Sequence, residues 1–133
     1  LPAHKIDGFD VWPIIAGQRG ATNPHAAYFF YYNQGELQGL RSGVWKLHLP
    51  HTARALHGRP GGKGGQPVAY EQLKVGTELY DLARDPGETK NVSAQNSDVV
   101  QRLLALAEEA RDDLGDSLTK RKGKGVREPG RVE

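Results

Sequence analysis

Cysteine is missing from all 133 residues, and so is methionine. Without cysteine the chain has no disulfide, no thiolate metal ligand and no Cys nucleophile. Its first residue is Leu1 rather than an initiator methionine, so we interpret the chain as a piece of a longer protein. No apolar run approaches the roughly 18 residues of a membrane-spanning helix, and we expect no membrane as a partner.

Two common catalytic motifs are missing as well. No serine lies in a Gly-x-Ser-x-Gly nucleophile elbow, and the sequence has no Gly-x-x-x-x-Gly-Lys-Ser/Thr phosphate loop. The spacing of His48, His51 and His57 invites a metal site, but no carboxylate lies close to them in the sequence. We therefore predict no metal site in this chain.

Glycine and proline are plentiful, with 17 glycines and 8 prolines against 37% hydrophobic residues. This composition suits one loop-rich domain. The net charge is +2, and the excess of positive charge lies in residues 119–133. We predict a basic, flexible tail there, because chain ends are disordered unless other contacts hold them.

The hydrophobic pattern predicts an α+β fold, a small four-stranded antiparallel sheet with one long C-terminal helix packed on it. Alternation and β-branched or aromatic runs mark the strands, and three- and four-residue spacing of apolar side chains marks the helix. The aromatic run 26–32 suits a central strand buried on both faces, although it could also be a stacking platform. The predicted strands are 26–32, 36–41, 44–49 and 78–82, and the predicted helix is 97–114.

Residues that favour helix ends and loops refine the predicted elements. Asp10 suits the start of a short helix that Gly17 ends, and Ser97 and Gly115 suit the start and end of the long helix. Within the long helix, Asp98 and Arg102 are spaced for a surface ion pair. Residues 50–76 show no regular pattern, and the Gly-rich part at 58–66 predicts a mobile loop.

Several motifs together resemble the C-terminal domain of the formylglycine-dependent sulfatases. The segments are Leu79-Tyr80-Asp81-Leu82 with Asp85-Pro86-Gly87-Glu88 and Asn91-Val92, the paired strands around Leu40–His48, and the stretch Asp7–Gly17. Tyr31-Tyr32 followed by Glu36-Leu37 is similar to the branch of arylsulfatase A and N-acetylgalactosamine-6-sulfatase. The resemblance covers roughly residues 6–115 and implies the same sheet-and-helix fold.

The resemblance also implies a domain organisation in which the catalytic groups lie outside this chain. Residues 1–20 would be the trailing segment of a missing N-terminal catalytic α/β domain, 21–118 the sulfatase C-terminal domain, and 119–133 the basic tail. Formylglycine and calcium would belong to the missing domain, because this chain has neither cysteine nor a Ser-x-Pro-x-Arg motif. The parent would hydrolyse aryl or sugar sulfates and be exported to the periplasm, the lysosome or the extracellular space. This chain alone would be inactive, with no catalytic residue of its own.

In such a sulfatase the small domain would pack on the catalytic domain and line the substrate cleft. The candidate contacts to a sulfated small molecule or glycan are Asn33, Glu36, Arg41, His48, His51 and His57. Two of these have simpler explanations, because Arg41 could pair with Glu36 across a turn and His48 could lie on a solvated face. Without its partner domain the fragment would expose an apolar patch and self-associate.

Two other functions fit parts of the sequence. The basic tail and basic Gly-rich loop would suit a free-standing module that binds polyanions such as sulfated glycans, with nucleic acid the less favoured partner. Alternatively, the domain would be a structural cap without ligand contact.

Overall fold

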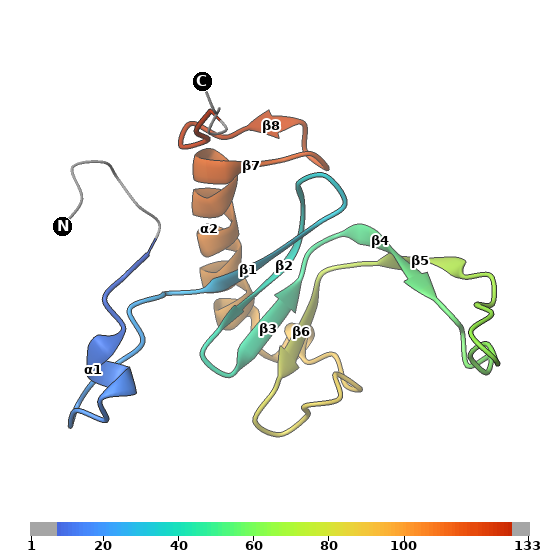
Figure 1. Ribbon diagram of the computed structural model, residues 1–133, viewed down its shortest axis with the longest axis horizontal. Helices are drawn as coiled ribbons and strands as arrows, with labels where there is room; N and C mark the ends of the chain where they lie inside the picture. The colour runs from blue at the N-terminus through green and yellow to red at the C-terminus, as the bar shows by residue number, and fades with distance from the viewer. Residues whose placement is uncertain (1–7, 129–133) are drawn as a thin grey trace.

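A computed structural model describes residues 8–128 of the chain (Figure 1). The first seven and last five residues lie outside the described part, and with them Asp7 of the predicted trailing segment and the end of the predicted tail. The elements in chain order are α1 (Trp12–Ile15), β1 (Tyr28–Tyr32), β2 (Glu36–Ser42), β3 (Trp45–His48), β4 (His51–Ala55), β5 (Glu71–Val75), β6 (Glu78–Asp81), the 3₁₀ turn η1 (Ser93–Gln95), α2 (Ser97–Leu114), β7 (Gly115–Asp116) and β8 (Arg121–Lys122).

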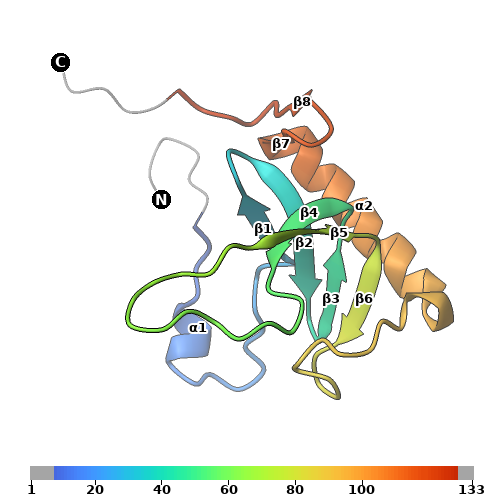
Figure 2. The ribbon, with the colours of Figure 1, turned by 90° about the vertical axis from the view of Figure 1, so that its right-hand side faces the viewer.

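The main sheet has the order β1-β2-β3-β6, and every neighbouring pair is antiparallel. Helix α2 lies across one face of this sheet (Figure 2). The predicted α+β fold with four antiparallel strands and one long helix is therefore confirmed. The predicted bounds of α2 agree with the structure to the residue.

The core lies between α2 and the main sheet. The main sheet and Leu49 just after β3 contribute fully buried leucines, and α2 contributes Leu103 and three smaller side chains of its apolar stripe. Leu114, predicted to continue that stripe, is 49% exposed because the helix ends at this residue. The core residues are Leu37, Leu40, Leu47, Leu49, Leu79, Val100, Leu103, Ala107 and Ala110.

Strand β1 lies at the edge of the main sheet, so the predicted central position of the aromatic run is wrong. Phe29 and Tyr31 pack against the core, whereas the rings of Tyr28 and Tyr32 are largely exposed on the other face. Burying only alternate rings is enough for an edge strand, because successive side chains point to opposite faces. A bulge between Phe30 and Tyr31 shifts the register against β2.

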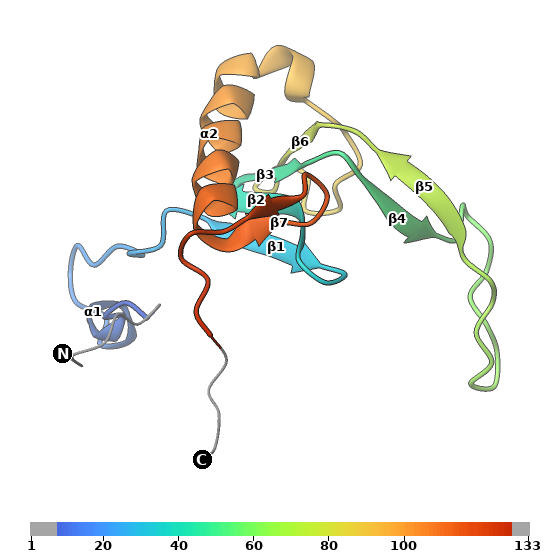
Figure 3. The same cartoon turned by 90° about the horizontal axis from the view of Figure 1, so that it is seen from above.

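Strands β4 and β5 form a separate two-stranded antiparallel sheet that the sequence did not predict. With the connecting residues 56–70 they make an arm that extends from the body on the side opposite α2 (Figure 3). The two strands are rich in polar residues and far apart in sequence, so neither alternation nor a turn motif marks them. The interpretation of residues 50–76 as irregular was therefore wrong for these two strands.

The glycines predicted near the helix C-termini are found there, whereas only one of the two predicted N-terminal capping residues makes a side-chain hydrogen bond. Gly17 and Gly115 both have positive φ, which favours glycine. Gly115 directly follows α2, and Gly17 follows α1 after Ala16. Asp10 accepts a hydrogen bond from the Trp12 amide at the start of α1. Helix α2, however, starts after Asn96 without a side-chain cap, so the predicted capping role of Ser97 is wrong.

The segment after α2 folds back onto the helix. Strand β8 pairs with β7, the Lys124 amide donates to the Asp112 carbonyl and the Gly125 amide donates to the Asp113 carbonyl. The first part of the predicted tail therefore contains a strand. The flexibility predicted for this tail stays a prediction, as do the domain boundaries at residues 20 and 118.

Candidate functional site

One face of the main sheet packs against α2, and the opposite face, here called the open face, carries the candidate site. Antiparallel pairing places two rows of side chains across it, one from Tyr28 to Tyr80 and one from Phe30 to Glu78. The members of the open face are Tyr28, Arg41, Lys46 and Tyr80 in the first row, Phe30, Gly39, His48 and Glu78 in the second, and Tyr32 beside them.

A hollow of about 320 Å³, here called the first hollow, lies on the open face. Gly39 lies between Phe30 and His48 in the second row. A Cβ at Gly39 would come within 2.8 Å of the Leu47 carbonyl oxygen, so this position excludes a side chain and leaves space between its neighbours. The lining residues are Tyr28, Phe29, Phe30, Tyr31, Tyr32, Gln38, Gly39, Lys46, His48 and His51.

Glu88 binds both polar side chains that β3 presents on the open face. Lys46 Nζ lies 2.6 Å from Glu88 Oε1, and His48 Nε2 lies 2.8 Å from Glu88 Oε2. The ammonium of Lys46 also lies 5.1 Å from the centre of the Phe30 ring, a cation–π distance. Because all three polar side chains are at most 28% exposed, these contacts are shielded from solvent.

Two opposing effects set the pKa of Glu88. Partial burial alone would raise it, but the hydrogen bonds from Lys46 and His48 and the positive charge of Lys46 outweigh burial and hold the pKa below its ordinary value of 4.5. Glu88 is therefore ionised at neutral pH. Its charge compensates that of Lys46 beside the first hollow.

The turn that carries Glu88 is held by Asp85. The Asp85 carboxylate accepts bonds from the backbone amides of Thr89 and Lys90 and from the Thr89 hydroxyl. These bonds lower the pKa of Asp85, with the Lys90 amide the largest cause. Glu88 has φ +53°, a left-handed conformation that few non-glycine residues adopt. The Asp85 bonds hold the backbone on either side of this strained position.

Tyr80 borders the same cluster from β6. Its hydroxyl donates to Glu78 Oε2 at 2.6 Å, and its ring lies edge-on to His48 with centroids 5.6 Å apart. Burial, followed by the hydrogen bond to Glu78, raises the pKa of Tyr80 to about 12. Tyr80 thus keeps its proton at neutral pH and acts as a hydrogen-bond donor.

A second carboxylate organises the turn between β1 and β2. Asn33 Nδ2 donates to Glu36 Oε1 at 3.2 Å, and Gln38 Nε2 donates to Glu36 Oε2 at 2.7 Å. Asn33 and Gln34 both have positive φ in this tight turn. A further hollow of about 340 Å³ runs from here to the arm, lined by Tyr32, Asn33, Gln38, Thr52, Ala53, Arg54 and Gln72.

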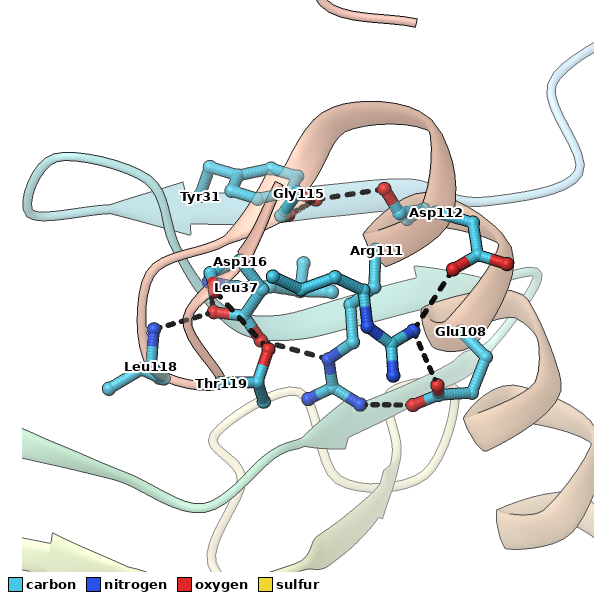
Figure 4. Close-up of polar contacts among 11 residues, drawn as sticks. Tyr31, Leu37, Glu108, Arg111, Asp112, Gly115, Asp116, Leu118 and Thr119 are labelled. Atoms are coloured by element: carbon cyan, nitrogen blue, oxygen red, sulfur yellow. Dashed lines mark hydrogen bonds and ion pairs between the residues drawn. The ribbon is translucent and has the colours of Figure 1, made fainter. Parts of the chain in front are cut away.

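The β1–β2 turn is fixed to the end of α2 by a buried polar network (Figure 4). Asp116, whose side chain is fully buried, accepts bonds from the backbone amides of Leu37 and Leu118 and from Arg111 Nε at 2.8 Å. Tyr31 donates its hydroxyl to the Gly115 carbonyl at 2.8 Å, and burial is the main cause that raises its pKa. The network holds the turn that carries Asn33 and Glu36 in a defined position.

The structure brings some of the predicted site residues together and leaves others apart. Asn33 contacts Glu36, and the rings of His48 and His51 are stacked with centroids 5.9 Å apart. Arg41 lies in the other row and borders a separate hollow of about 930 Å³.

Two ion pairs considered from the sequence are absent from the described contacts, and His57 lies apart from His48 and His51. Arg41 donates to the Gly43 carbonyl rather than to Glu36, and Arg102 donates to the Ser42 hydroxyl rather than to Asp98. His57 lies beyond β4 on the arm, 3.8 Å from Glu71.

Sequence reasoning missed several residues of this site, notably Lys46, Glu88, Phe30 and Gln38. Lys46 was detectable, because it alternates with His48 along β3 and must share its face. Glu88 was not detectable as a partner of these residues, since about forty positions separate it from them. Gln38 enters the site through the bulge in register, which hydrophobic alternation does not reveal.

Two further properties of the described residues bear on function. Within residues 8–128, the histidines, aspartates and glutamates form no group of three or more that could hold a metal ion. No helix in the same part of the chain combines the length and apolar character that crossing a membrane requires.

Comparison with known proteins connects this architecture to a family. Residues 23–127 match the family described as the C-terminal region of aryl-sulfatase. Human arylsulfatase A is 30% identical over 118 residues, which is 80% of this chain and 22% of the human protein. Bovine arylsulfatase A is 28% identical over 111 residues, 78% of this chain and 21% of the bovine protein. The chain thus spans about a fifth of the length of these relatives. Because the family match covers more than half of the chain, the chain belongs to the family of aryl-sulfatase C-terminal regions.

Proposed function

We propose that the chain is the C-terminal domain of an exported sulfatase that hydrolyses sulfate esters of aryl or sugar alcohols. The observation that carries this proposal is the family match over residues 23–127. The open face supports it physically, because it joins exposed aromatic rings to a hollow that also has polar side chains in its lining. Such a face suits contact with another domain and with a ligand between the two.

The reactive groups of the proposed enzyme lie outside this chain. The sequence has no cysteine and no Ser-x-Pro-x-Arg motif from which formylglycine could form, and residues 8–128 offer no cluster that fits calcium. The residues present therefore do not fit either group, and no catalytic step passes through them. We expect the chain alone to leave sulfate esters intact.

The role of the domain is to pack on a catalytic domain and to line one side of its substrate cleft. Exposed apolar side chains of α1 and of the open face would make the domain contact, foremost Trp12, Ile15 and Tyr28. The cleft would be lined by the polar groups around the first hollow and the β1–β2 turn. These candidates are Asn33, Glu36, His48 and His51, together with Arg41 at the separate hollow of about 930 Å³ and His57 on the arm.

The alternative of a free-standing polyanion-binding module receives less support. Arg121 of the basic tail pairs with Glu108 and Asp112, and Arg59 of the Gly-rich loop pairs with Glu71. These arginines are partly neutralised within the chain. A polyanion would have to displace carboxylates from them before binding.

A chimera tests the proposal. Residues 23–127 would replace the matching C-terminal part of human arylsulfatase A, and hydrolysis of an aryl sulfate would be compared with hydrolysis of a sulfated sugar. We expect a folded chimera that hydrolyses sulfate esters with an altered ratio of kcat/KM between the two substrates. Near-UV circular dichroism reports whether the chimera is folded.

The outcomes separate the possible functions. A folded chimera that hydrolyses neither ester would contradict the sulfatase proposal. A folded, active chimera with unchanged substrate preference would indicate that the domain is a structural cap without ligand contact. Association of the isolated chain with DNA or heparin that weakens steeply with salt would instead favour the polyanion-binding module.

A further inference from the structure

Two histidines stack beside the first hollow. The rings of His48 and His51 lie 14° from parallel with centroids 5.9 Å apart, and both line the hollow. They come from consecutive strands, β3 and β4, at the point where the chain leaves the main sheet for the arm. Their hydrogen bonds determine what they offer to a ligand.

Each ring has one nitrogen committed to a group that only accepts hydrogen bonds. His48 Nε2 faces the Glu88 carboxylate at 2.8 Å, and His51 Nδ1 faces the Leu49 carbonyl at 2.6 Å. These nitrogens must carry the protons, so in the neutral rings Nδ1 of His48 and Nε2 of His51 are acceptors. No residue in the described part of the chain bonds these two acceptor nitrogens.

The other polar groups around the hollow offer both donors and an acceptor. Gln38 binds Glu36 through one proton of its amide nitrogen, which leaves its second amide proton as a donor and its carbonyl oxygen as an acceptor. Lys46 keeps N–H donors beyond its bond to Glu88, but the Glu88 carboxylate compensates its charge. Sugar hydroxyls can both donate and accept at such a site, whereas the charge of a sulfate would meet acceptor nitrogens and an already compensated cation.

An aromatic ring completes the hollow. Tyr32 is 64% exposed, and its ring stacks on no other ring among the described residues. Gly39 leaves the floor of the hollow open, because a side chain there would clash with the Leu47 carbonyl. Rings that carry hydroxyl groups suit such a site, because one C–H face can pack on an aromatic ring while the hydroxyls donate to acceptors.

We propose that the first hollow binds a neutral ring with neighbouring hydroxyl groups, the chemistry of a sugar, and that Glu88 is a positioning residue for it. Glu88 acts through His48, because its carboxylate keeps the proton on Nε2 and leaves Nδ1 as an acceptor. This inference rests on the proposed function, in which the ring would be the part of the substrate that carries no sulfate.

Nuclear magnetic resonance of the histidine side chains tests the proposal in the isolated chain. At pH 8, where an ordinary imidazole is neutral, we expect the Nε2–H tautomer for His48 and the Nδ1–H tautomer for His51. Adding methyl β-galactoside should shift the resonances of His48 Nδ1, His51 Nε2 and the Tyr32 ring. Inorganic sulfate at the same concentration should leave them unchanged.

Two variants and one control sharpen the test. Tyr32→Ala should weaken galactoside binding by about tenfold, the typical contribution of one aromatic stacking partner. Tyr70→Ala removes a comparably exposed ring that lines none of the described hollows, and should leave binding within twofold. Glu88→Gln should shift the proton of His48 toward Nδ1, since a glutamine amide can donate to Nε2, and should weaken binding in parallel.

Three results would overturn the proposal. They are shifts with sulfate but not with galactoside, a Tyr32→Ala variant that binds as well as the original chain, and Glu88→Gln with an unchanged His48 tautomer. None of these bears on sulfate ester hydrolysis by the chimera. Failure of this inference and failure of the proposed function are therefore separately visible.

Discussion

At Glu88 a single carboxylate joins β3 to the turn at residues 85–88, because each of its oxygens has its own partner. The folded-state pKa of Glu88 is lowered, so its stabilising contribution is present above the unfolded value of about 4.5 and is lost as the pH falls through the folded value. We expect Glu88→Gln to lower the free energy of unfolding by roughly 1 kcal/mol at pH 7.

Urea unfolding at several pH values checks this expectation. The difference between the original chain and Glu88→Gln should shrink below pH ~4.5 and vanish at the acidic end, once the carboxylate is protonated. Glu109→Gln, on an exposed position of α2, is the matched control and should change little at any pH. A difference for Glu88→Gln that persists unchanged in acid would show that its charge is not the cause.

Asp116 has a fully buried carboxylate that accepts hydrogen bonds from three donors. Asp116→Ala would leave Arg111 Nε and two backbone amides without their acceptor in a buried setting, although Arg111 would keep its bond to Glu108. We expect a loss of about 3 kcal/mol in the free energy of unfolding, the usual effect of removing one partner of a buried ion pair.

The exposed neighbour Asp112 provides the comparison for Asp116. Its carboxylate is 61% exposed and pairs with Arg121 at 3.2 Å, so Asp112→Ala should shift the urea midpoint only slightly. Equal effects of the two variants would contradict the assignment of Asp116 as the buried anchor of the network.

At the scale of elements, the sequence predicts what local patterns determine and misses what depends on distant partners. Helix α2 was predictable because its apolar stripe repeats with the helical period and Gly115 ends it. The edge position of β1 was not, since seven successive apolar residues at 26–32 read as fully buried.

The candidate site likewise combines features that local sequence patterns predict with contacts that depend on distant residues. Placing His48 and Lys46 on one face needs only the strand period, whereas the bond from Glu88 to both depends on how the 85–88 turn folds over β3. The stacking of His48 on His51 depends on the path from β3 into the arm. A sequence pattern contains neither piece of geometry.

The arm is the element expected to open first. An isolated two-stranded sheet is marginally stable, and β4 and β5 pair extensively only with each other. Lys63 lies among glycines in the connecting residues 56–70, whereas Arg59 is held by the Ala69 carbonyl and Glu71. Brief trypsin treatment should therefore cut after Lys63 before any site in the main sheet or α2, and mass spectrometry identifies the cut.

The variant Lys63→Gln provides the control for this cleavage. It should remove the first cut and leave the thermal midpoint unchanged, because the arm contributes nothing to the core. A first cut within the main sheet or α2 would contradict the ranking of the elements by stability.

At the scale of the whole molecule, the chain leaves much apolar surface uncovered. The exposed side chains include Trp12 at 63%, Ile15 at 69% and Tyr28 at 67%. Large exposed apolar patches mark contact surfaces, and in the proposed enzyme a catalytic domain would cover this one. Isolated chains can cover this apolar surface only by contact with one another.

We therefore expect the isolated chain to self-associate as its concentration rises. Sedimentation velocity should show the average mass increasing between micromolar and hundred-micromolar protein, with binding of a hydrophobic dye that declines in step. Replacing an α1 side chain by Ile15→Ser should weaken the association, because it removes apolar area from the contact. Val126→Ser, at a similarly exposed position after β8, should not. A monomer at every concentration, without dye binding, would mean that the exposed rings are no docking surface and that the packing role proposed for the domain needs another face.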